Sequence, residues 1–271
     1  MPSLPERRLE GLCLRSHPLG EADRLLTLLT REEGLLRVVA AGARRPRSTL
    51  AAAAPLVLLE ALVARGRSLD RLRQLQVRHS YTRLGQSLET LATAQWLLEL
   101  TQLLLPEGAA PPGLLELLLH RLGQLEELLQ GDPALVRPEA LGLAAQGGVQ
   151  LLSLGGYALP LDVDADRGEP LQPPLGNRDW RCSLDPAVGF RLGRRPGAAL
   201  VLTASELALL QRLTRPQLPR RADGGLMGPE PVWLRLLTLL DLWCREHLGR
   251  RPRSLALLRQ DCGAAGGTEP G

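Results

Sequence analysis

The sequence predicts an α+β protein, in which a small N-terminal β-structure is followed by a mostly α-helical C-terminal domain with an irregular insertion. Five short apolar runs, separated by turn residues, occupy the first 80 residues. From Leu84 onward, the spacing of the apolar residues changes to that of amphipathic helices. Residues 160–200 are rich in proline, glycine and aspartate, a composition that is typical of irregular structure.

The apolar runs have the length of short strands joined by turns. The first four cover residues 9–15, 24–30, 35–41 and 55–64. The fifth, residues 68–79, alternates apolar and polar residues imperfectly, so that both a strand and a helix fit it. Five such runs predict a small β-barrel or sandwich, although the mild helical preference of leucine acts against this interpretation.

The helical part divides at its proline and glycine residues. Residues 84–102 and 114–129 have apolar residues at helical spacing, and Asp132 and Pro133 are typical first residues of a third helix. Helices are expected again over residues 203–213 and 231–248. The expected domains are a barrel (1–80), a helical domain (81–160), the insertion (161–200), a second helical part (201–260) and a disordered tail (261–271).

Composition excludes several classes of protein. The chain has 33 arginines, no lysine, and 67 leucines among 271 residues, so leucine must fill most of the core. No apolar run reaches the ~18–20 residues of a membrane span, and Glu6 and Glu10 interrupt the place of a signal peptide. The cysteines are scattered without a CxxC pair, so we expect no disulfide framework and a reducing cytoplasm: Cys13, Cys182, Cys244 and Cys262.

No catalytic motif is present, and no cofactor or catalytic residue is expected. A Walker A loop needs a lysine, and neither a GxSxG nor an HExxH sequence occurs. The alternating carboxylates of Asp162, Asp164 and Asp166 suggest a cation site, but an EF-hand loop would need glycine and glutamate where Arg167 and Pro173 stand. A solvated acidic turn is therefore favoured over a metal-dependent nuclease.

Charge is distributed unevenly along the chain. Residues 1–80 hold 14 arginines and 8 acidic residues, whereas residues 81–150 hold 3 arginines and 8 acidic residues. Within the basic region, residues 42–48 place three guanidinium groups and a hydroxyl in one proline-containing turn: Arg44, Arg45, Arg47 and Ser48. This combination suits a phosphate backbone, and a solubilising surface loop is the alternative.

The sequence around this turn resembles the RecO family of bacterial recombination mediators. The resemblance is dense over residues 9–80, which contain LLTREEGLLRVVAAGARRPRS, and looser over the helices up to Gly156 and Tyr157. It returns at residues 247–258, HLGRRPRSLALL, whereas residues 161–230 show little to align. The family fold implies an N-terminal OB-fold barrel, then a helical domain with an irregular insertion.

The resemblance also implies a function. It implies a non-enzymatic protein that binds single- and double-stranded DNA, anneals complementary strands and helps RecA to displace single-strand-binding protein, with RecR as partner, in the bacterial cytoplasm at the nucleoid. Arg44, Arg45 and Arg47 match the basic loop of the family, and the basic end of the closing segment corresponds to Arg250, Arg251 and Arg253. Arg15 and Arg73 are further DNA-binding candidates in the basic region.

The sequence departs from the family pattern in two ways. Many members carry a four-cysteine zinc site in the insertion, but no cysteine lies near Asp164 or Arg167, and Cys182 is isolated, so no zinc is expected. The predicted barrel also contains no aromatic residue on which bases could stack. We therefore expect binding through phosphates that depends strongly on salt and little on base sequence.

The acidic helical domain is a candidate protein-binding surface. The resemblance implies that it accepts the acidic C-terminal tail of single-strand-binding protein. Such a tail needs cations, and residues 81–150 offer only Arg83, Arg121 and Arg137, among which Arg121 is the candidate contact. A plain helical core with a solvated acidic face is the alternative for these residues. For the whole chain, the alternative function is a helical scaffold or adaptor without DNA activity.

Overall fold

A five-stranded barrel forms the N-terminal domain. The structure is a computed structural model that describes residues 6–259, so the expected tail lies outside the described residues. The barrel closes in the order β1-β2-β3-β5-β4, with β3 and β5 parallel and the other pairs antiparallel. This is an OB-fold, as expected. Its strands are β1 (Glu6–Leu19), β2 (Asp23–Thr30), β3 (Gly34–Ala40), β4 (Val57–Ala64) and β5 (Asp70–Ser80).

The uninterrupted apolar runs arise because β2 and β3 are buried on both faces. Leu28 and Leu36 face the barrel interior, whereas their neighbours Leu29 and Leu35 pack against the helices. Adjacent residues of a strand point to opposite faces, so a Leu-Leu pair contributes one side chain to each core. The fifth run is a strand, β5, which removes the ambiguity between strand and helix at residues 68–79.

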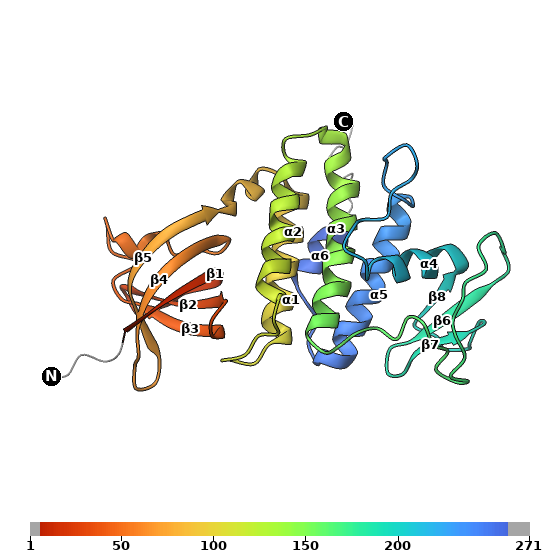
Figure 1. The fold of residues 1–271 in the computed structure, drawn as a ribbon, viewed down its shortest axis with the longest axis horizontal. Helices are drawn as coiled ribbons and strands as arrows, with labels where there is room; N and C mark the ends of the chain where they lie inside the picture. The colour runs from red at the N-terminus through yellow and green to blue at the C-terminus, as the bar shows by residue number, and fades with distance from the viewer. Residues whose placement is uncertain (1–5, 260–271) are drawn as a thin grey trace, which may run out of the picture.

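Four long helices pack beside the barrel, as Figure 1 shows. They are α1 (Leu88–Leu104), α2 (Leu114–Leu128), α3 (Pro133–Leu154) and α5 (Glu230–Leu248). The first helix begins later than predicted, because Ser87 is its N-cap and residues 81–86 form a 3-10 turn. Trp96 of α1 donates a hydrogen bond to the Ala144 carbonyl of α3 at 3.1 Å. No helix among residues 6–259 is long and apolar enough to span a membrane.

The barrel and the helical domain pack closely against each other at a glycine. Gly34 has a φ of +68°, and a Cβ there would lie 2.3 Å from the carbonyl carbon of Ala109. The segments also exchange backbone hydrogen bonds, from Leu35 N to Ala109 O at 3.3 Å and from Gly108 N to Leu35 O at 2.7 Å. The loop after α1 therefore lies directly against the start of β3.

The insertion is more ordered than the sequence predicted. It contains a three-stranded antiparallel sheet in the order β7-β6-β8, which the sequence did not predict, whereas residues 161–180 and 193–199 lie outside the regular helices and strands. Each strand has four or five residues, too few for a periodic pattern to emerge between the glycines and prolines: β6 (Arg181–Asp185), β7 (Gly189–Leu192) and β8 (Leu200–Thr203). This sheet leads into α4 (Ala204–Arg212) at the end of the molecule opposite the barrel (Figure 1).

Candidate nucleic-acid interface

A basic row crosses the outer face of β1, β2 and β3. Arg15 is paired with Thr27, and Thr27 with Arg37, so the three side chains share one face. A β-bulge at Leu14 determines this placement, because the register passes from Cys13 opposite Leu28 directly to Arg15 opposite Thr27. The extra residue turns Arg15 outward, whereas strict alternation from the buried Cys13 would point it into the barrel.

The C-terminal segment, residues 249–259, lies opposite this row. After α5 the chain turns at Gly249, which has a φ of +63°, and enters α6 (Ser254–Arg259). The Glu99 carboxylate of α1 accepts the backbone N–H groups of Arg253 at 3.0 Å and Ser254 at 2.9 Å. Asp241 of α5, which is 7% exposed, holds the same segment by ion pairs with Arg251 at 2.8 Å and Arg259 at 3.2 Å.

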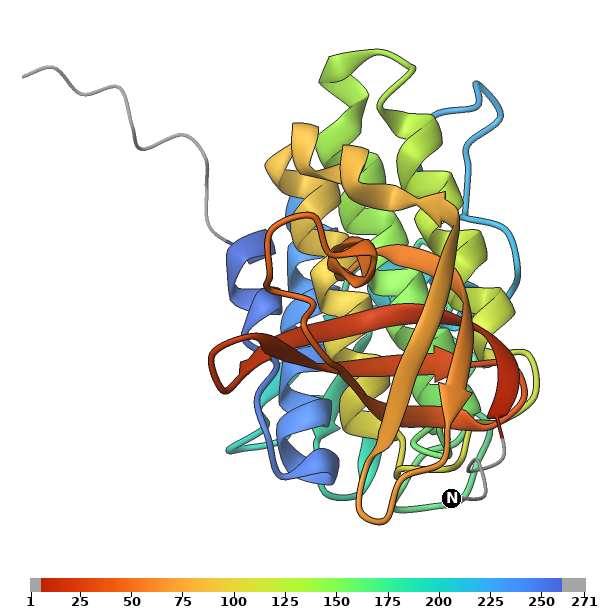
Figure 2. The ribbon, with the colours of Figure 1, turned by 90° about the vertical axis from the view of Figure 1, so that its left-hand side faces the viewer.

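The barrel face and the C-terminal segment enclose a cleft of about 1140 Å³. In Figure 2, the blue helices α5 and α6 lie on the same side of the molecule as the hairpin of β1 and β2. The polar floor of the cleft comes from α1 and includes Gln95, Glu99 and Gln102. Its walls carry five arginines from opposite ends of the sequence: Arg15, Arg37, Arg250, Arg251 and Arg253.

Most of the positive charge in the cleft is available to a ligand. Arg251 is paired with Asp241, and this carboxylate raises the pKa of the guanidinium. Among residues 6–259, no carboxylate pairs with the side chains of the other four cleft arginines. Glu99 is the acidic group of the cleft floor, and its oxygens already accept hydrogen bonds from residues 253 and 254. The cleft is therefore electropositive.

The basic loop after β3 lies at the end of the same barrel face. The Arg44 N–H donates to the Ala22 carbonyl at 2.8 Å, and its guanidinium donates to the Gly20 carbonyl at 2.9 Å. These contacts fix the loop to the turn between β1 and β2. The arginines at positions 44, 45 and 47 are exposed. Leu19 lies next to this turn, four residues along β1 from Arg15 in the cleft. Four residues of a strand span roughly 13 Å, so the loop continues the surface that begins in the cleft.

Two predicted site residues lie elsewhere. Arg73 is on β5, outside the cleft and the loop, with Glu6 at 3.9 Å. Arg121 is only 1% exposed and donates hydrogen bonds to Gln150 Oε1 at 2.6 Å and to the Pro216 carbonyl at 3.3 Å. Burial lowers the pKa of this guanidinium to about 10. A tail peptide could reach Arg121 only if the segment around Pro216 moved.

The aspartate-rich turn forms hydrogen bonds that hold the insertion together. Asp164 is 3% exposed, so it is not the solvated residue that the sequence suggested. Its carboxylate accepts the N–H groups of Asp166 at 3.0 Å, Arg167 at 2.9 Å and Leu192 at 2.5 Å. Within the described part of the chain, no three His, Cys, Asp or Glu side chains are grouped so that they could hold a metal ion.

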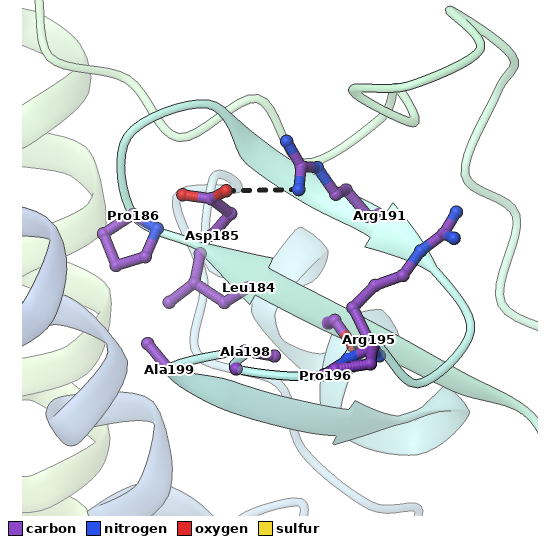
Figure 3. Close-up of a pocket in the computed structure, with 10 residues that line it drawn as sticks. Leu184, Asp185, Pro186, Arg191, Arg195, Pro196, Ala198 and Ala199 are labelled. Atoms are coloured by element: carbon purple, nitrogen blue, oxygen red, sulfur yellow. Dashed lines mark hydrogen bonds and ion pairs between the residues drawn. The ribbon is translucent and has the colours of Figure 1, made fainter.

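A small pocket of about 150 Å³ lies in the sheet of the insertion (Figure 3). Arg191 pairs there with Asp185 at 3.3 Å and with Asp166 at 3.0 Å. Arg195 also pairs with Asp166, at 2.9 Å. Because carboxylates within the insertion already neutralise both guanidinium groups, this pocket is a weaker candidate for an anionic ligand than the cleft.

Sequence comparisons cover both domains. Residues 4–81 match the family model described as Recombination protein O N terminal, and residues 85–256 match Recombination protein O C terminal. The chain is similar to a DNA repair protein RecO of Prochlorococcus marinus (strain MIT 9303), with 54% identity over 94% of this chain and 95% of the relative. A DNA repair protein RecO of Synechococcus sp. (strain WH7803) is 53% identical over 95% and 94% of the two chains. That of Synechococcus elongatus (strain ATCC 33912 / PCC 7942 / FACHB-805) is 38% identical over 92% of each.

Proposed function

Because the chain belongs to the RecO family of DNA repair proteins, we propose that it is a non-enzymatic mediator that anneals complementary DNA strands during recombinational repair. The observation that supports this proposal best is the cleft, which brings Arg15 and Arg37 of the barrel together with Arg250 and Arg253 of the C-terminal segment. Guanidinium groups on two facing walls can contact the phosphates of one strand from both sides.

The chemistry of the cleft favours annealing over tight storage of a strand. No aromatic side chain lines it, so bases are not held by stacking. A strand bound through its phosphates leaves the hydrogen-bonding edges of its bases free to pair. The cationic walls also reduce the repulsion between two phosphate backbones, which otherwise slows their approach.

The annealing of two complementary oligonucleotides, measured by fluorescence quenching with and without EDTA, tests this function. We expect annealing that EDTA does not change, and a loss of most of it when Arg44, Arg45 and Arg47 are replaced together by alanine. Metal-dependent cleavage would support a nuclease instead. An absence of any effect on DNA would support a scaffold or adaptor.

The cleft has its own test. Replacing Arg15 and Arg37 by alanine removes two phosphate contacts, so the slope of log affinity against log salt for single-stranded DNA should become shallower by about 1.4. Both side chains are on the outer face and have no carboxylate partner among residues 6–259, so the melting temperature should be unchanged. An unchanged salt slope would contradict the assignment of the strand to the cleft.

The proposal extends to protein partners. A mediator of this kind acts at the nucleoid with RecR and RecA, and its helical domain binds the acidic tail of single-strand-binding protein. Arg121 is the proposed contact for that tail, and the segment around Pro216 must open to expose it. Titration of an acidic tail peptide should show weaker binding to R121A than to the unmodified protein. A thermal melt of both proteins separates loss of the contact from loss of folding.

A further inference from the structure

A second basic surface lies on the other side of the barrel. It is formed by the hairpin of β4 and β5, which faces the viewer in Figure 2. We call it the arginine face, and it consists of Arg65, Arg67, Arg71, Arg73 and Arg78, all of which are exposed. No residue of this face lines the cleft. The barrel therefore presents two separate basic surfaces.

Much of the charge on the arginine face is not neutralised. Arg78 is paired with Glu60, and Arg73 has Glu6 at 3.9 Å. Within residues 6–259, no carboxylate forms an ion pair with the other three arginines, which lie in the β4–β5 turn and at the start of β5. Asp70 attracts Arg65 but is itself paired with Arg7 at 2.6 Å, so an anionic ligand can bind to these three arginines without breaking an ion pair.

Two β-bulges place arginines on this face. Leu62 is opposite Gln74 and Val63 is opposite Leu72, so Arg73 is an extra residue on β5. In the same way, His79 is opposite Leu58 and Val77 is opposite Leu59, which makes Arg78 the extra residue of the second bulge. The extra residue of a bulge is left without a partner on the neighbouring strand. Both extra residues of β5 are thus arginines that project outward.

The character of the face favours a nucleic acid over a protein. A protein interface usually has an apolar centre, but Val77, 42% exposed, is the one large exposed hydrophobic residue of this hairpin. The seven residue steps from Arg71 to Arg78 span about 23 Å, which corresponds to roughly seven phosphates at the spacing of one strand in a duplex.

We propose that the arginine face binds a second DNA strand while the cleft holds the first. The proposal rests on the annealing function above and deepens it, because annealing requires two polyanions to be held close together. Two cationic surfaces on opposite sides of one small barrel can neutralise both backbones without competing for the same arginines. Each surface then holds one of the two strands that are to pair.

Native mass spectrometry can count the strands bound to each protein copy. The probes are two oligothymidylates of different length, which cannot pair with each other. We expect up to two strands on the unmodified protein but one on R65A/R67A/R71A/R73A, with affinity for the first strand changed less than threefold. Annealing of complementary strands should be at least tenfold slower. Lysine at the same four positions should restore both properties, because a phosphate accepts either cation.

A matched control removes four exposed arginines from other parts of the molecule: Arg178, Arg194, Arg215 and Arg245. This variant loses the same net charge and should still bind two strands. Two strands and normal annealing on the arginine-face variant would overturn the proposal and assign the face to another anionic partner. If the unmodified protein neither binds nor anneals DNA, the annealing function itself fails, and this inference fails with it.

Discussion

Asp164 organises a segment whose sequence is typical of irregular structure. Its carboxylate connects residues 164–167 to the end of β7 through three backbone N–H groups. The neighbouring Asp166 adds ion pairs to Arg191 and Arg195. These contacts tie residues 164–167 to the sheet of the insertion. Hydrogen bonds to a buried carboxylate therefore provide cross-links here that do not depend on cysteine.

Replacing Asp164 by asparagine should lower stability at pH 7 by about 1–3 kcal/mol, because buried N–H groups lose a charged acceptor. Burial alone would raise the pKa of Asp164, but the three N–H donors outweigh it and hold the pKa below its ordinary value. A carboxylate with a lowered pKa stabilises the fold above about pH 4, and this contribution disappears as the pH falls through the folded-state pKa. Urea unfolding at pH 7 and at pH 3 should show the difference between the two proteins shrinking in acid. Equal stability at pH 7 would contradict this role.

At the scale of elements, α6 depends on Glu99. The carboxylate accepts both backbone N–H groups at the start of this short helix and also the Ser254 hydroxyl. Because α6 has only six residues, it has little stability of its own and needs such contacts. The second wall of the cleft therefore depends on a residue of α1.

The variant E99A should bind DNA several-fold more weakly. Removal of an acidic group from a DNA cleft ordinarily strengthens binding, so the expected effect is opposite to that of charge alone. Faster hydrogen exchange over residues 249–259 should accompany the loss of affinity. E246A, which removes an exposed acid of α5, is the control and should not weaken binding. Tighter binding by E99A would show that Glu99 acts through its charge.

Two alanine variants, G34A and G20A, test the contact between the barrel and the helical domain at Gly34. Alanine at position 34 must adopt a positive φ and also place its Cβ 2.3 Å from Ala109, so it should cost more than about 2 kcal/mol. Gly20 also has a positive φ, of +60°, but nothing lies within 4 Å of its Cβ position. G20A therefore reports the backbone cost alone, about 1 kcal/mol. Urea unfolding measures both, and equal losses would mean that the contact with Ala109 relaxes freely.

The sequence predicted the positions of the helices and strands better than the contacts between them. Apolar runs such as residues 24–30 located the barrel strands, because burial on two faces leaves a continuous hydrophobic signal. The four-residue strand β7 left no such signal. The cleft could not be derived from spacing, since Arg15 and Arg250 belong to distant parts of the chain. The β-bulges were equally hidden, because they depend on pairing between strands and not on either strand alone.

At the scale of the whole molecule, affinity for DNA should come mainly from phosphate contacts. Seven arginines with no carboxylate partner among residues 6–259 lie along the cleft and loop: Arg15, Arg37, Arg44, Arg45, Arg47, Arg250 and Arg253. If each meets one phosphate of a single strand, the slope of log affinity against log salt is roughly −5, a loss of about a thousandfold between 50 and 200 mM. Fluorescence anisotropy with homopolymers of different bases measures this slope. A flat response, or a strong preference for one base, would contradict binding through phosphates.

The two walls of the cleft are synthesised at different times. All five barrel strands leave the ribosome before α1, whereas residues 249–259 follow every long helix of the fold. N-terminal domains generally fold first during synthesis, so the nascent barrel displays its basic loop and arginine face while the cleft does not yet exist. A partly synthesised chain can therefore attract nucleic acid only on open surfaces. The enclosed binding path arises after α5 and α6 have docked.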